Sequence, residues 1–280
     1  MTDLLPAYNP ARHVPGRFWA LVPCAGTGTR ALRAQPGARA ALPKQYQAVA
    51  GQPMVLHTLA AFAGVARLAG TLVAVAPGDG FFDSHPHPGY FAVPCGGPTR
   101  ADTVLGGLKA LQARGALDED WVLVHDAARC LVTTAQIDAL IDACQHDGVG
   151  GLLAHKLADT LKTATDGPGG VRVAATVDRS DKWLAQTPQM FRLGALCRAL
   201  EYVGAGATDE ASAMEAMGLR PRLVPGSAQN FKVTYPDDFA LAEAVLAQRM
   251  HGATVARFGG ERGAAASDPI NPFFSRTPPR

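Results

Sequence analysis

Short apolar runs alternate with helix-like stretches through the first half of the chain. The runs typical of buried strands cover residues 18–22, 71–76, 91–93, 121–124 and 152–154. Between them, apolar residues recur every three or four positions, as in amphipathic helices, over residues 53–65, 100–114 and 137–144. Strands that alternate with helices pair in parallel through crossover connections. The sequence therefore predicts an α/β fold: a Rossmann-like, mainly parallel twisted sheet flanked by helices.

The pattern changes over about residues 155–182. Two β-prone runs flank the turn-forming stretch Asp166-Gly167-Pro168-Gly169-Gly170, which predicts a protruding β-hairpin arm instead of another crossover unit. An isolated hairpin is marginally stable in water, so we expect this arm to pack on another surface, such as a second subunit. Beyond the arm, helices are predicted over 192–202, 209–217 and 236–250, and strand-like runs over 222–224 and 231–234.

The 280 residues are predicted to form one main domain with two flanking segments. The main domain spans residues 17–250 and follows an N-terminal extension, residues 1–16. Residues 251–280 are rich in Gly, Ala and Pro and show no periodicity, which predicts a disordered tail.

Composition excludes several classes of protein. No run approaches the roughly 20 apolar residues of a membrane span, and residues 1–16 lack the apolar core of a secretory signal. The net charge of +2 argues against bulk nucleic-acid binding. The five cysteines form no CxxC pair, so we expect a reduced, cytoplasmic protein without a zinc cluster.

The first predicted strand runs into a small, glycine-rich stretch, Pro23 to Arg30 (PCAGTGTR). Closely spaced glycines let backbone N–H groups approach a phosphate, and residues 4–78 contain seven Arg or Lys residues but no Asp or Glu. These features predict a polyphosphate site bracketed by Arg30 and Lys44. An ordinary glycine turn fits the spacing about equally well. A dinucleotide fingerprint would need an acidic residue about 20 positions on, and a Walker A loop would need Gly-Lys-Ser/Thr; neither is present.

Further candidate residues follow the later elements. Asp126 and Arg129 come directly after the strand at 121–124, and parallel α/β sheets bind ligands at the carboxyl ends of their strands. Asp126 could hold Mg²⁺ together with substrate phosphates or cap a helix, and Arg129 could clamp a phosphate or pair with Asp126. Lys232 lies in a β-prone run, where a lysine usually faces solvent. Thr208 is predicted to be the N-cap of a helix.

Nine segments of the chain resemble, in order, the 2-C-methyl-D-erythritol 4-phosphate cytidylyltransferase family of the non-mevalonate isoprenoid pathway. They are PCAGTGTR (23–30), LPKQY (42–46), GGPTRADTVLGGL (96–108), VLVHDAAR (122–129), ADTLK (158–162), TVDR (176–179), QTPQMF (186–191), TDEASAME (208–215) and NFKVTYPDD (230–238). One segment alone would be a weak signal, but nine in order are highly specific. The resemblance implies that residues 17–250 form a nucleotidyltransferase domain.

The resemblance also implies a reaction. CTP and 2-C-methyl-D-erythritol 4-phosphate would give 4-diphosphocytidyl-2-C-methyl-D-erythritol and pyrophosphate, through in-line attack on the α-phosphorus. Such chemistry depends mainly on positioning and charge neutralisation. The implied catalytic residues are Arg30, Lys44 and Lys232. The implied nucleotide-binding residues are Pro23, Cys24, Ala25, Gly26, Gly28, Gly97 and Thr103, and the Thr103 hydroxyl would read the cytosine. The implied substrate-binding residues are Asp126, Arg129, Thr160, Arg179 and Thr208, with Asp126 also next to Mg²⁺ or another divalent cation.

In the family the arm reaches across a homodimer, so the resemblance implies that Thr160 and Arg179 complete the site of the other subunit. Three positions depart from the family pattern. Cys24 stands where alanine is frequent, which changes little. Cys130 replaces a proline, so we expect a looser turn and a less fixed Arg129. Gln229 stands where some members place an acid, which leaves a second metal carboxylate open.

Three other functions are compatible with parts of the pattern. A cytidylyltransferase for another polyol phosphate, such as ribitol or glycerol phosphate, would use the same glycine loop. A dinucleotide-binding reductase is disfavoured by the missing acidic residue. A non-catalytic nucleotide-binding module would bind CTP without turnover, but no matched catalytic position is lost.

Overall fold

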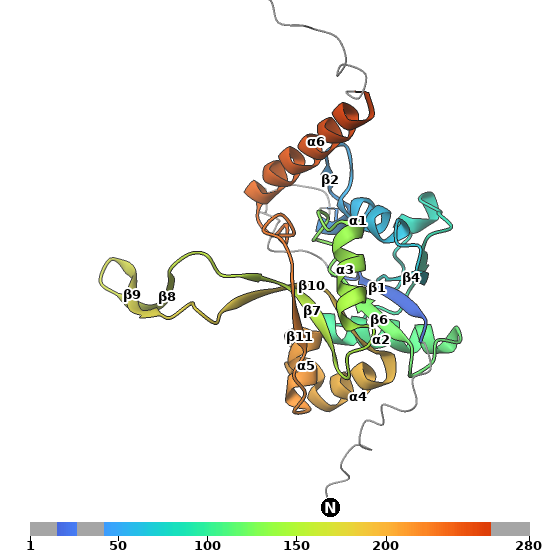
Figure 1. The fold of residues 1–280 in the computed structure, drawn as a ribbon, viewed down its shortest axis with the longest axis horizontal. Helices are drawn as coiled ribbons and strands as arrows, with labels where there is room; N and C mark the ends of the chain where they lie inside the picture. Colours follow the sequence, from blue (N-terminus) through green and yellow to red (C-terminus); the bar gives the residue numbers. More distant parts are fainter. Residues whose placement is uncertain (1–15, 27–41, 259–280) are drawn as a thin grey trace, which may run out of the picture.

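The computed structural model describes residues 16–26 and 42–258 of the chain, and its centre is a seven-stranded sheet (Figure 1). The strand order is β11-β7-β10-β6-β1-β4-β5. The strands are β1 (Phe18–Pro23), β4 (Leu68–Ala74), β5 (Phe91–Val93), β6 (Trp121–Val124), β7 (Gly150–Lys156), β10 (Trp183–Arg192) and β11 (Arg222–Pro225). All neighbours are parallel except β10, which is antiparallel to both β6 and β7. The predicted mainly parallel sheet is therefore confirmed.

Helices cover both faces of the sheet. The first face carries α2 (Arg100–Ala113), α4 (Leu193–Val203) and α5 (Glu210–Ala216), and the second carries α1 (Met54–Ala63) and α3 (Thr134–Cys144). Strand β6 shows why both faces are apolar: Val122 and Val124 pack on the first layer, whereas Trp121 and Leu123 pack on the second. Successive side chains of a strand point to opposite faces, so a strand buried on both sides reads as a continuous apolar run.

Three helices begin with a capping box, in which a side chain and a backbone N–H exchange hydrogen bonds across three residues. The pairs are Thr99 with Asp102, Thr133 with Gln136, and Asp209 with Ser212. The predicted N-cap Thr208 is therefore wrong by one residue, because the Asp209 carboxylate accepts the Ser212 N–H. These boxes fix where α2 and α5 begin, and both helices begin at the site described below.

The second half of the chain departs from the sequence prediction in three places. Strand β10 was not expected. Residues 231–234, expected to be strand-like, form no strand, although the Val233 N–H donates to the Ala128 carbonyl. The last helix, α6 (Pro236–Phe258), continues eight residues past the predicted end, into the segment expected to be a disordered tail.

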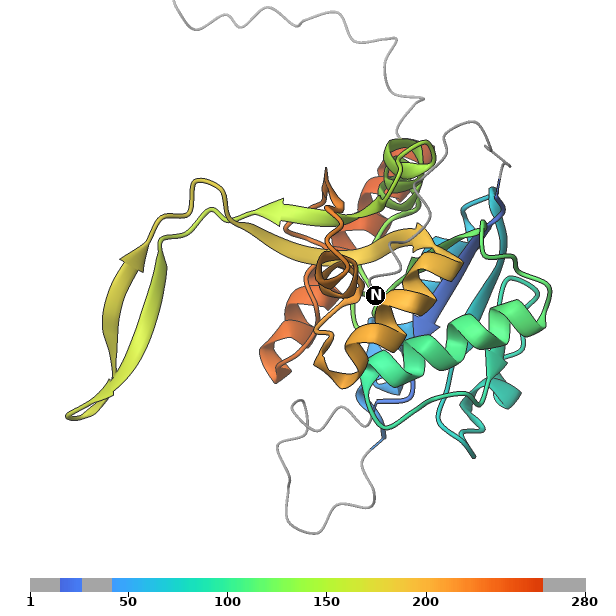
Figure 2. The same ribbon diagram turned by 90° about the horizontal axis from the view of Figure 1, so that it is seen from below.

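The predicted arm is present as a two-stranded hairpin, β8 (Leu161–Gly167) and β9 (Gly170–Val177). Figures 1 and 2 show it extending away from the central sheet on the continuation of β7 and β10. Gly169 and Gly170 turn the chain with φ of 78° and 114°, values that favour glycine. Val171 and Val173 are 72% and 65% exposed, so the arm carries apolar surface that the chain itself does not bury.

Short elements complete the part of the chain that the structure describes. The small ladder of β2 (Ala48–Val49) and β3 (Gln52–Pro53) lies under α6, and three 3₁₀ turns are η2 (Lys44–Tyr46), η3 (Phe81–Ser84) and η4 (Gly204–Gly206). Across residues 16–26 and 42–258, every helix is too short or too polar to cross a membrane. All five cysteines are unpaired.

Candidate active site

A cavity of about 340 Å³ opens at the carboxyl ends of β1 and β6, bounded by the start of α2. Nine of the predicted site residues line it: Pro23, Cys24, Ala25, Gly26, Lys44, Gly97, Thr103, Asp126 and Lys232. Arg30 and Gly28 lie outside the described residues. A larger cavity of about 570 Å³ lies between α1 and residues 85–90 and contains none of the predicted residues. The fold thus gathers positions that are up to 209 residues apart, Pro23 to Lys232, around one opening.

The glycine-rich wall of this cavity is held from behind by Gln45. Its side-chain amide donates hydrogen bonds to the carbonyls of Cys24 and Gly26, both at 2.9 Å. These bonds tie down two carbonyl oxygens, which would otherwise repel an anion in the cavity. Gln45 was quoted in the LPKQY motif but not assigned a role, because the contact joins elements 19 and 21 residues apart.

The opposite wall packs tightly against the first. A methyl group on Gly96 would lie 2.3 Å from Ala25 Cβ and 2.8 Å from the Val75 carbonyl oxygen, so only glycine fits. The neighbouring Gly97 N–H donates to the hydroxyl of Thr103 at 3.1 Å, and that hydroxyl donates to the Thr99 carbonyl at 2.9 Å. In this structure Thr103 therefore shapes the wall at Gly97. Its predicted contact to cytosine stays a prediction.

The floor of the cavity is an ion-pair network centred on Asp126. Arg100 Nε donates to Oδ1 at 2.9 Å, Lys232 Nζ donates to Oδ2 at 2.7 Å, and Arg129 Nε lies 4.0 Å from Oδ2. Burial opposes ionisation of this carboxyl, but Arg100, Lys232 and Arg129 together hold its pKa well below the usual range. Asp126 is thus an ionised carboxylate at working pH, and it is not a helix cap.

Arg100 extends the network to a second buried carboxylate. Its Nη1 and Nη2 donate to the two oxygens of Glu210, at 2.6 and 3.1 Å. Burial disfavours the guanidinium charge, but Glu210 and Asp126 raise the pKa of Arg100 above its usual value. Neither Arg100 nor Glu210 was predicted as a site residue. Both stand at the starts of helices, within matched segments. At a helix start, an acidic residue such as Glu210 is ordinarily explained by its favourable interaction with the helix dipole. Only the fold reveals that Arg100 and Glu210 are in contact.

His125 supports Asp126 from behind. Its Nε2 donates to the Arg129 carbonyl at 3.1 Å, and its Nδ1 lies 3.0 Å from the Thr187 hydroxyl, which accepts the Asp126 N–H at 3.0 Å. A carbonyl can only accept, so the ring proton sits on Nε2 and Nδ1 accepts from Thr187. Burial lowers the pKa of His125 to about 4, which keeps the ring neutral. The ring therefore orients the turn and carries no charge.

Arg129 is fixed on the other side of the network. Its Nη1 donates to the Asn230 carbonyl at 2.8 Å and its Nη2 to the Ala185 carbonyl at 3.2 Å. The expected loosening by Cys130 is not observed, because Cys130 is buried and Arg129 is held by both carbonyls. A second cavity of about 160 Å³ beside it is lined by Arg100, Asp126, Arg129, Ala185, Gln186, Thr187, Gln189, Thr208, Asp209 and Lys232. The two cavities share Arg100, Asp126 and Lys232, which places these three side chains between them.

Lys44 and Lys232 meet at the first cavity although 188 residues separate them. Lys44 Nζ donates to the carbonyl of Val233, the neighbour of Lys232, at 2.5 Å. Lys232 does not simply face solvent, since its ammonium group pairs with Asp126. Two lysines and two arginines, Arg100 and Arg129, thus surround two carboxylates, which leaves the site electropositive and suited to phosphate groups.

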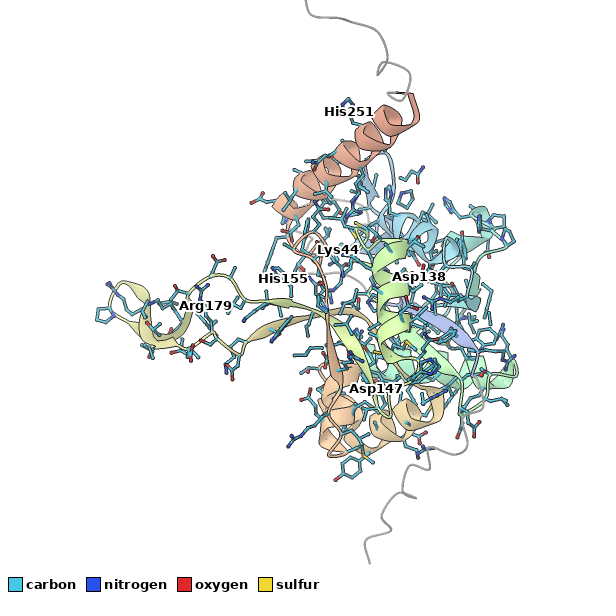
Figure 3. The ribbon with its side chains drawn as sticks, viewed as in Figure 1. Lys44, Asp138, Asp147, His155, Arg179 and His251 are labelled. Atoms are coloured by element: carbon cyan, nitrogen blue, oxygen red, sulfur yellow. The ribbon has the colours of Figure 1, made fainter. Side chains whose placement is uncertain are left out.

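Thr160 and Arg179 are exposed and lie on the arm, away from both cavities of their own chain. Figure 3 shows Arg179 on the arm, between the hairpin and the central body, while Lys44 lies at the central body. The structure of one chain therefore does not bring these two residues into the site.

The donor set fits Mg²⁺ in one way only. No group of three or more His, Cys, Asp or Glu side chains that could hold a metal occurs among the described residues. Mg²⁺ is commonly held by one or two carboxylates plus substrate phosphates, and Asp126 supplies one carboxylate at a cavity suited to phosphates. Gln229 accepts a hydrogen bond from Arg249 and adds no carboxylate. Asp126 thus fits a cation that arrives with the triphosphate.

Comparison with known proteins decides the family. The sequence model of 2-C-methyl-D-erythritol 4-phosphate cytidylyltransferase matches residues 18–248. The chain belongs to this family. Its sequence is similar to the Paraburkholderia phymatum protein named 2-C-methyl-D-erythritol 4-phosphate cytidylyltransferase, with 50% identity over 241 residues, 84% of this chain and 99% of that protein.

A longer relative is also similar. The protein of Albidiferax ferrireducens named "Bifunctional enzyme IspD/IspF" is 59% identical over 265 residues. The aligned region covers 94% of this chain but only 61% of that longer relative. Among solved structures, one of 4-diphosphocytidyl-2C-methyl-D-erythritol synthase has a TM-score of 0.71 at 38% identity, covering 83% of this chain and 99% of the other. The Francisella tularensis 2-C-methyl-D-erythritol 4-phosphate cytidylyltransferase has a TM-score of 0.67 at 30% identity, covering 82% and 100%.

The family membership confirms the resemblance, the fold class and the enzyme class predicted from the sequence. The chain is a nucleotidyltransferase, and CTP with 2-C-methyl-D-erythritol 4-phosphate is the substrate pair of its family's reaction in the isoprenoid pathway. The roles of individual residues, the metal ion and the dimer remain predictions.

Proposed function

We propose that this chain joins CTP to 2-C-methyl-D-erythritol 4-phosphate in the cavity at the ends of β1 and β6. The family membership supports the reaction. The observation that carries the placement is the convergence of Lys44, Lys232 and the glycine-rich wall on one electropositive opening.

The reaction needs charge neutralisation more than covalent help. A phosphate oxygen of methylerythritol phosphate attacks the α-phosphorus of CTP. The new O–P bond forms as the bond to the bridging oxygen breaks, and that electron pair leaves with pyrophosphate. Lys44 and Lys232 are placed to neutralise the charge on the transferring group, as the resemblance also implies for Arg30. Loss of one such group commonly costs about 10²–10³ in rate.

Lys232 can bind Asp126 and the substrate together. Its ammonium group is 2.7 Å from Asp126 Oδ2, and the three donors of a lysine ammonium group allow a second bond to a phosphate oxygen in the cavity. Asp126 stays anchored through Oδ1 on Arg100, so the carboxylate keeps Lys232 in place beside the substrate.

A divalent cation bound with CTP would withdraw charge from the triphosphate and help pyrophosphate leave. Asp126 is the residue that would hold it. The walls at Cys24–Gly26 and Gly97 would hold the nucleotide through backbone groups, and Thr103 would approach the base. Arg129 and Thr208 would contact methylerythritol phosphate from the second cavity.

We further propose a homodimer in which the arm completes the site of the other subunit. Support comes from the exposed Val171 and Val173 on a hairpin that its own chain does not cover, and from the distance of Arg179 from the cavities of its own chain (Figure 3). The unpaired cysteines favour a reducing compartment such as the cytoplasm.

Mixed subunits test this arrangement. Lys44→Ala chains and Arg179→Ala chains are each expected to be nearly inactive alone. After random reassociation, half of the sites in each heterodimer are intact, so activity should recover to roughly a quarter of the wild-type value. Dimers that form but show no recovery would contradict the shared site. A near wild-type rate of Lys44→Ala alone would contradict the placement of the chemistry.

A further inference from the structure

Arg100 is the one described side chain that joins both substrate cavities to two carboxylates. It stands at the first position of α2, and its guanidinium group spans from Asp126, at the end of β6, to Glu210, at the first position of α5. Glu210 is 1% exposed and Asp126 is 9% exposed. Three of the five N–H donors of a guanidinium are thus committed to carboxylates that the fold removes from water.

These contacts decide how Asp126 is oriented. Arg100 Nε holds Oδ1 at 2.9 Å, which leaves Oδ2 directed at Lys232 at 2.7 Å. Glu210 accepts hydrogen bonds from the other two guanidinium nitrogens, Nη1 and Nη2, so the plane of the guanidinium group is also fixed. A bidentate fork of this kind gives directional specificity that a single ammonium group cannot reproduce.

The geometry points to Arg100 as a positioning residue for the cytidylyl transfer: it fixes Asp126 so that Oδ2 holds Lys232 toward the reacting phosphates. This inference rests on the proposed function, since it assigns Arg100 an effect through Asp126 and Lys232. Arg100 acts on the site by holding Asp126, because its donors are directed to the two carboxylates.

Charge alone does not explain this role. Arg100, Arg129 and Lys232 carry three positive charges against the two negative charges of Asp126 and Glu210, a net charge of +1. Replacing Arg100 by lysine keeps that charge balance but removes the planar guanidinium group that binds both carboxylates at once. Arg100→Lys therefore separates orientation from charge.

The chain offers a matched control. Arg67 also forks onto two carboxylates, Asp138 at 2.7 Å and Asp142 at 2.6 Å, on the outside of α3 and away from both cavities. Arg67→Lys makes the same chemical change in the same kind of ion pair. It should leave the rate of pyrophosphate release unchanged.

The test is a kinetic double-mutant cycle of Arg100→Lys with Asp126→Asn, measured as pyrophosphate release at varied CTP, methylerythritol phosphate and Mg²⁺, with the melting temperature of each variant. Arg100→Lys should lower kcat roughly 10- to 100-fold, as loss of a group that orients a ligand residue does, and leave both KM values within about threefold. In the Asp126→Asn background it should cost less than about threefold, because the residue it orients is already changed.

Several results would overturn the inference. Equal fold-losses in both backgrounds would mean that Arg100 acts independently of Asp126. A large rise in the KM for CTP with unchanged kcat would mean direct substrate contact. A loss explained wholly by a smaller folded fraction, with normal kcat per folded site, would mean a structural role only.

Two further outcomes are separated by design. If Arg100→Lys does not fold, Glu210→Gln replaces it. Glu210→Gln keeps the Arg100 bond to Asp126 but weakens the contacts that fix the guanidinium plane. It should lower kcat by less than Asp126→Asn does, with unchanged KM. An unchanged kcat would refute the positioning role. If Asp126→Asn itself keeps the wild-type rate, the proposed role of Asp126 and this inference fail together; if Asp126→Asn is impaired but Arg100→Lys costs the same in both backgrounds, the inference alone fails.

Discussion

Substitution of Lys232 by alanine should separate catalysis from stability. The ammonium group of Lys232 makes one ion pair, with Asp126 at 2.7 Å, and the lysine side chain is 36% exposed. A partly exposed ion pair contributes about 0.2–1 kcal/mol after solvent screening. Asp126 keeps its bond to Arg100 in the variant, so no buried carboxylate is left without a partner.

The expected loss of stability is therefore small. For a chain of this size, 1 kcal/mol corresponds to roughly 2–4 °C in Tm, so Lys232→Ala should melt within about 4 °C of the wild type. The expected loss of rate is much larger. Removing a cation that faces the developing phosphate charge should lower kcat by about 10²–10³, or roughly 3–4 kcal/mol of transition-state stabilisation.

Steady-state pyrophosphate release at saturating substrates, alongside a thermal melt, measures both quantities. Lys109→Ala is the matched control, because Lys109 forms an ion pair with Glu201 at 2.8 Å on the outer surface of α2. It should keep full activity and a similar Tm. Near-full activity of Lys232→Ala, or a loss of activity only in proportion to a large loss of folded protein, would refute the catalytic role of Lys232.

Three further predictions concern neighbouring residues. Gln45→Leu removes two hydrogen bonds of about 1 kcal/mol each to the glycine-rich wall and should raise the KM for CTP by roughly tenfold in steady-state assays; an unchanged KM would show that the wall holds without Gln45. Gly96→Ala places a methyl group 2.3 Å from Ala25 Cβ and should cost about 1–3 kcal/mol in urea unfolding as well as weaken CTP binding; wild-type values for both would contradict the close packing. Burial opposes ionisation of Asp120, but hydrogen bonds from Leu117, Trp19 and Arg17 lower its pKa. Its stabilising effect should be complete above about pH 4 and lost as pH falls below that value, and Asp120→Asn should flatten that part of the unfolding profile; a variant with the same pH dependence as the wild type would refute the assignment.

The parallel core was predictable because its signal is local. Strands β1, β4 and β6 are buried on both faces, so each reads as an unbroken apolar run whatever surrounds it. The ends of these strands then located Cys24 and Asp126 at one edge of the sheet. The order of the strands and the antiparallel insertion of β10 had no comparable local signal.

Strand β10 was missed because several of its buried positions are polar. Gln186, Thr187 and Gln189 are all less than 6% exposed, yet their polar atoms are satisfied by distant groups such as the Ser227 carbonyl and the Asp209 carboxylate. A buried amide with remote partners is indistinguishable in sequence from a solvated one. The extension of α6 was missed for another reason: residues 251–280 are rich in Gly, Ala and Pro and show no periodicity, which predicted a disordered tail, but the helix continues to Phe258.

The site shows the same division. Motifs located Lys44, Asp126 and Lys232, because these residue types follow strand ends or lie in matched segments. The partners that orient them could not be found in this way. Arg100 and Glu210 are 110 residues apart, and each has an ordinary local explanation as a helix-start residue. Only the contact between α2 and α5, made by the fold, brings them together.

The most direct test of the account is pyrophosphate release by the purified chain with CTP and Mg²⁺, comparing methylerythritol phosphate with ribitol 5-phosphate and glycerol 3-phosphate. Release is expected with methylerythritol phosphate alone, lowered by about 10²–10³ in Lys232→Ala and retained in Lys109→Ala. Release only with ribitol or glycerol phosphate, or no release with any of the three, would contradict it.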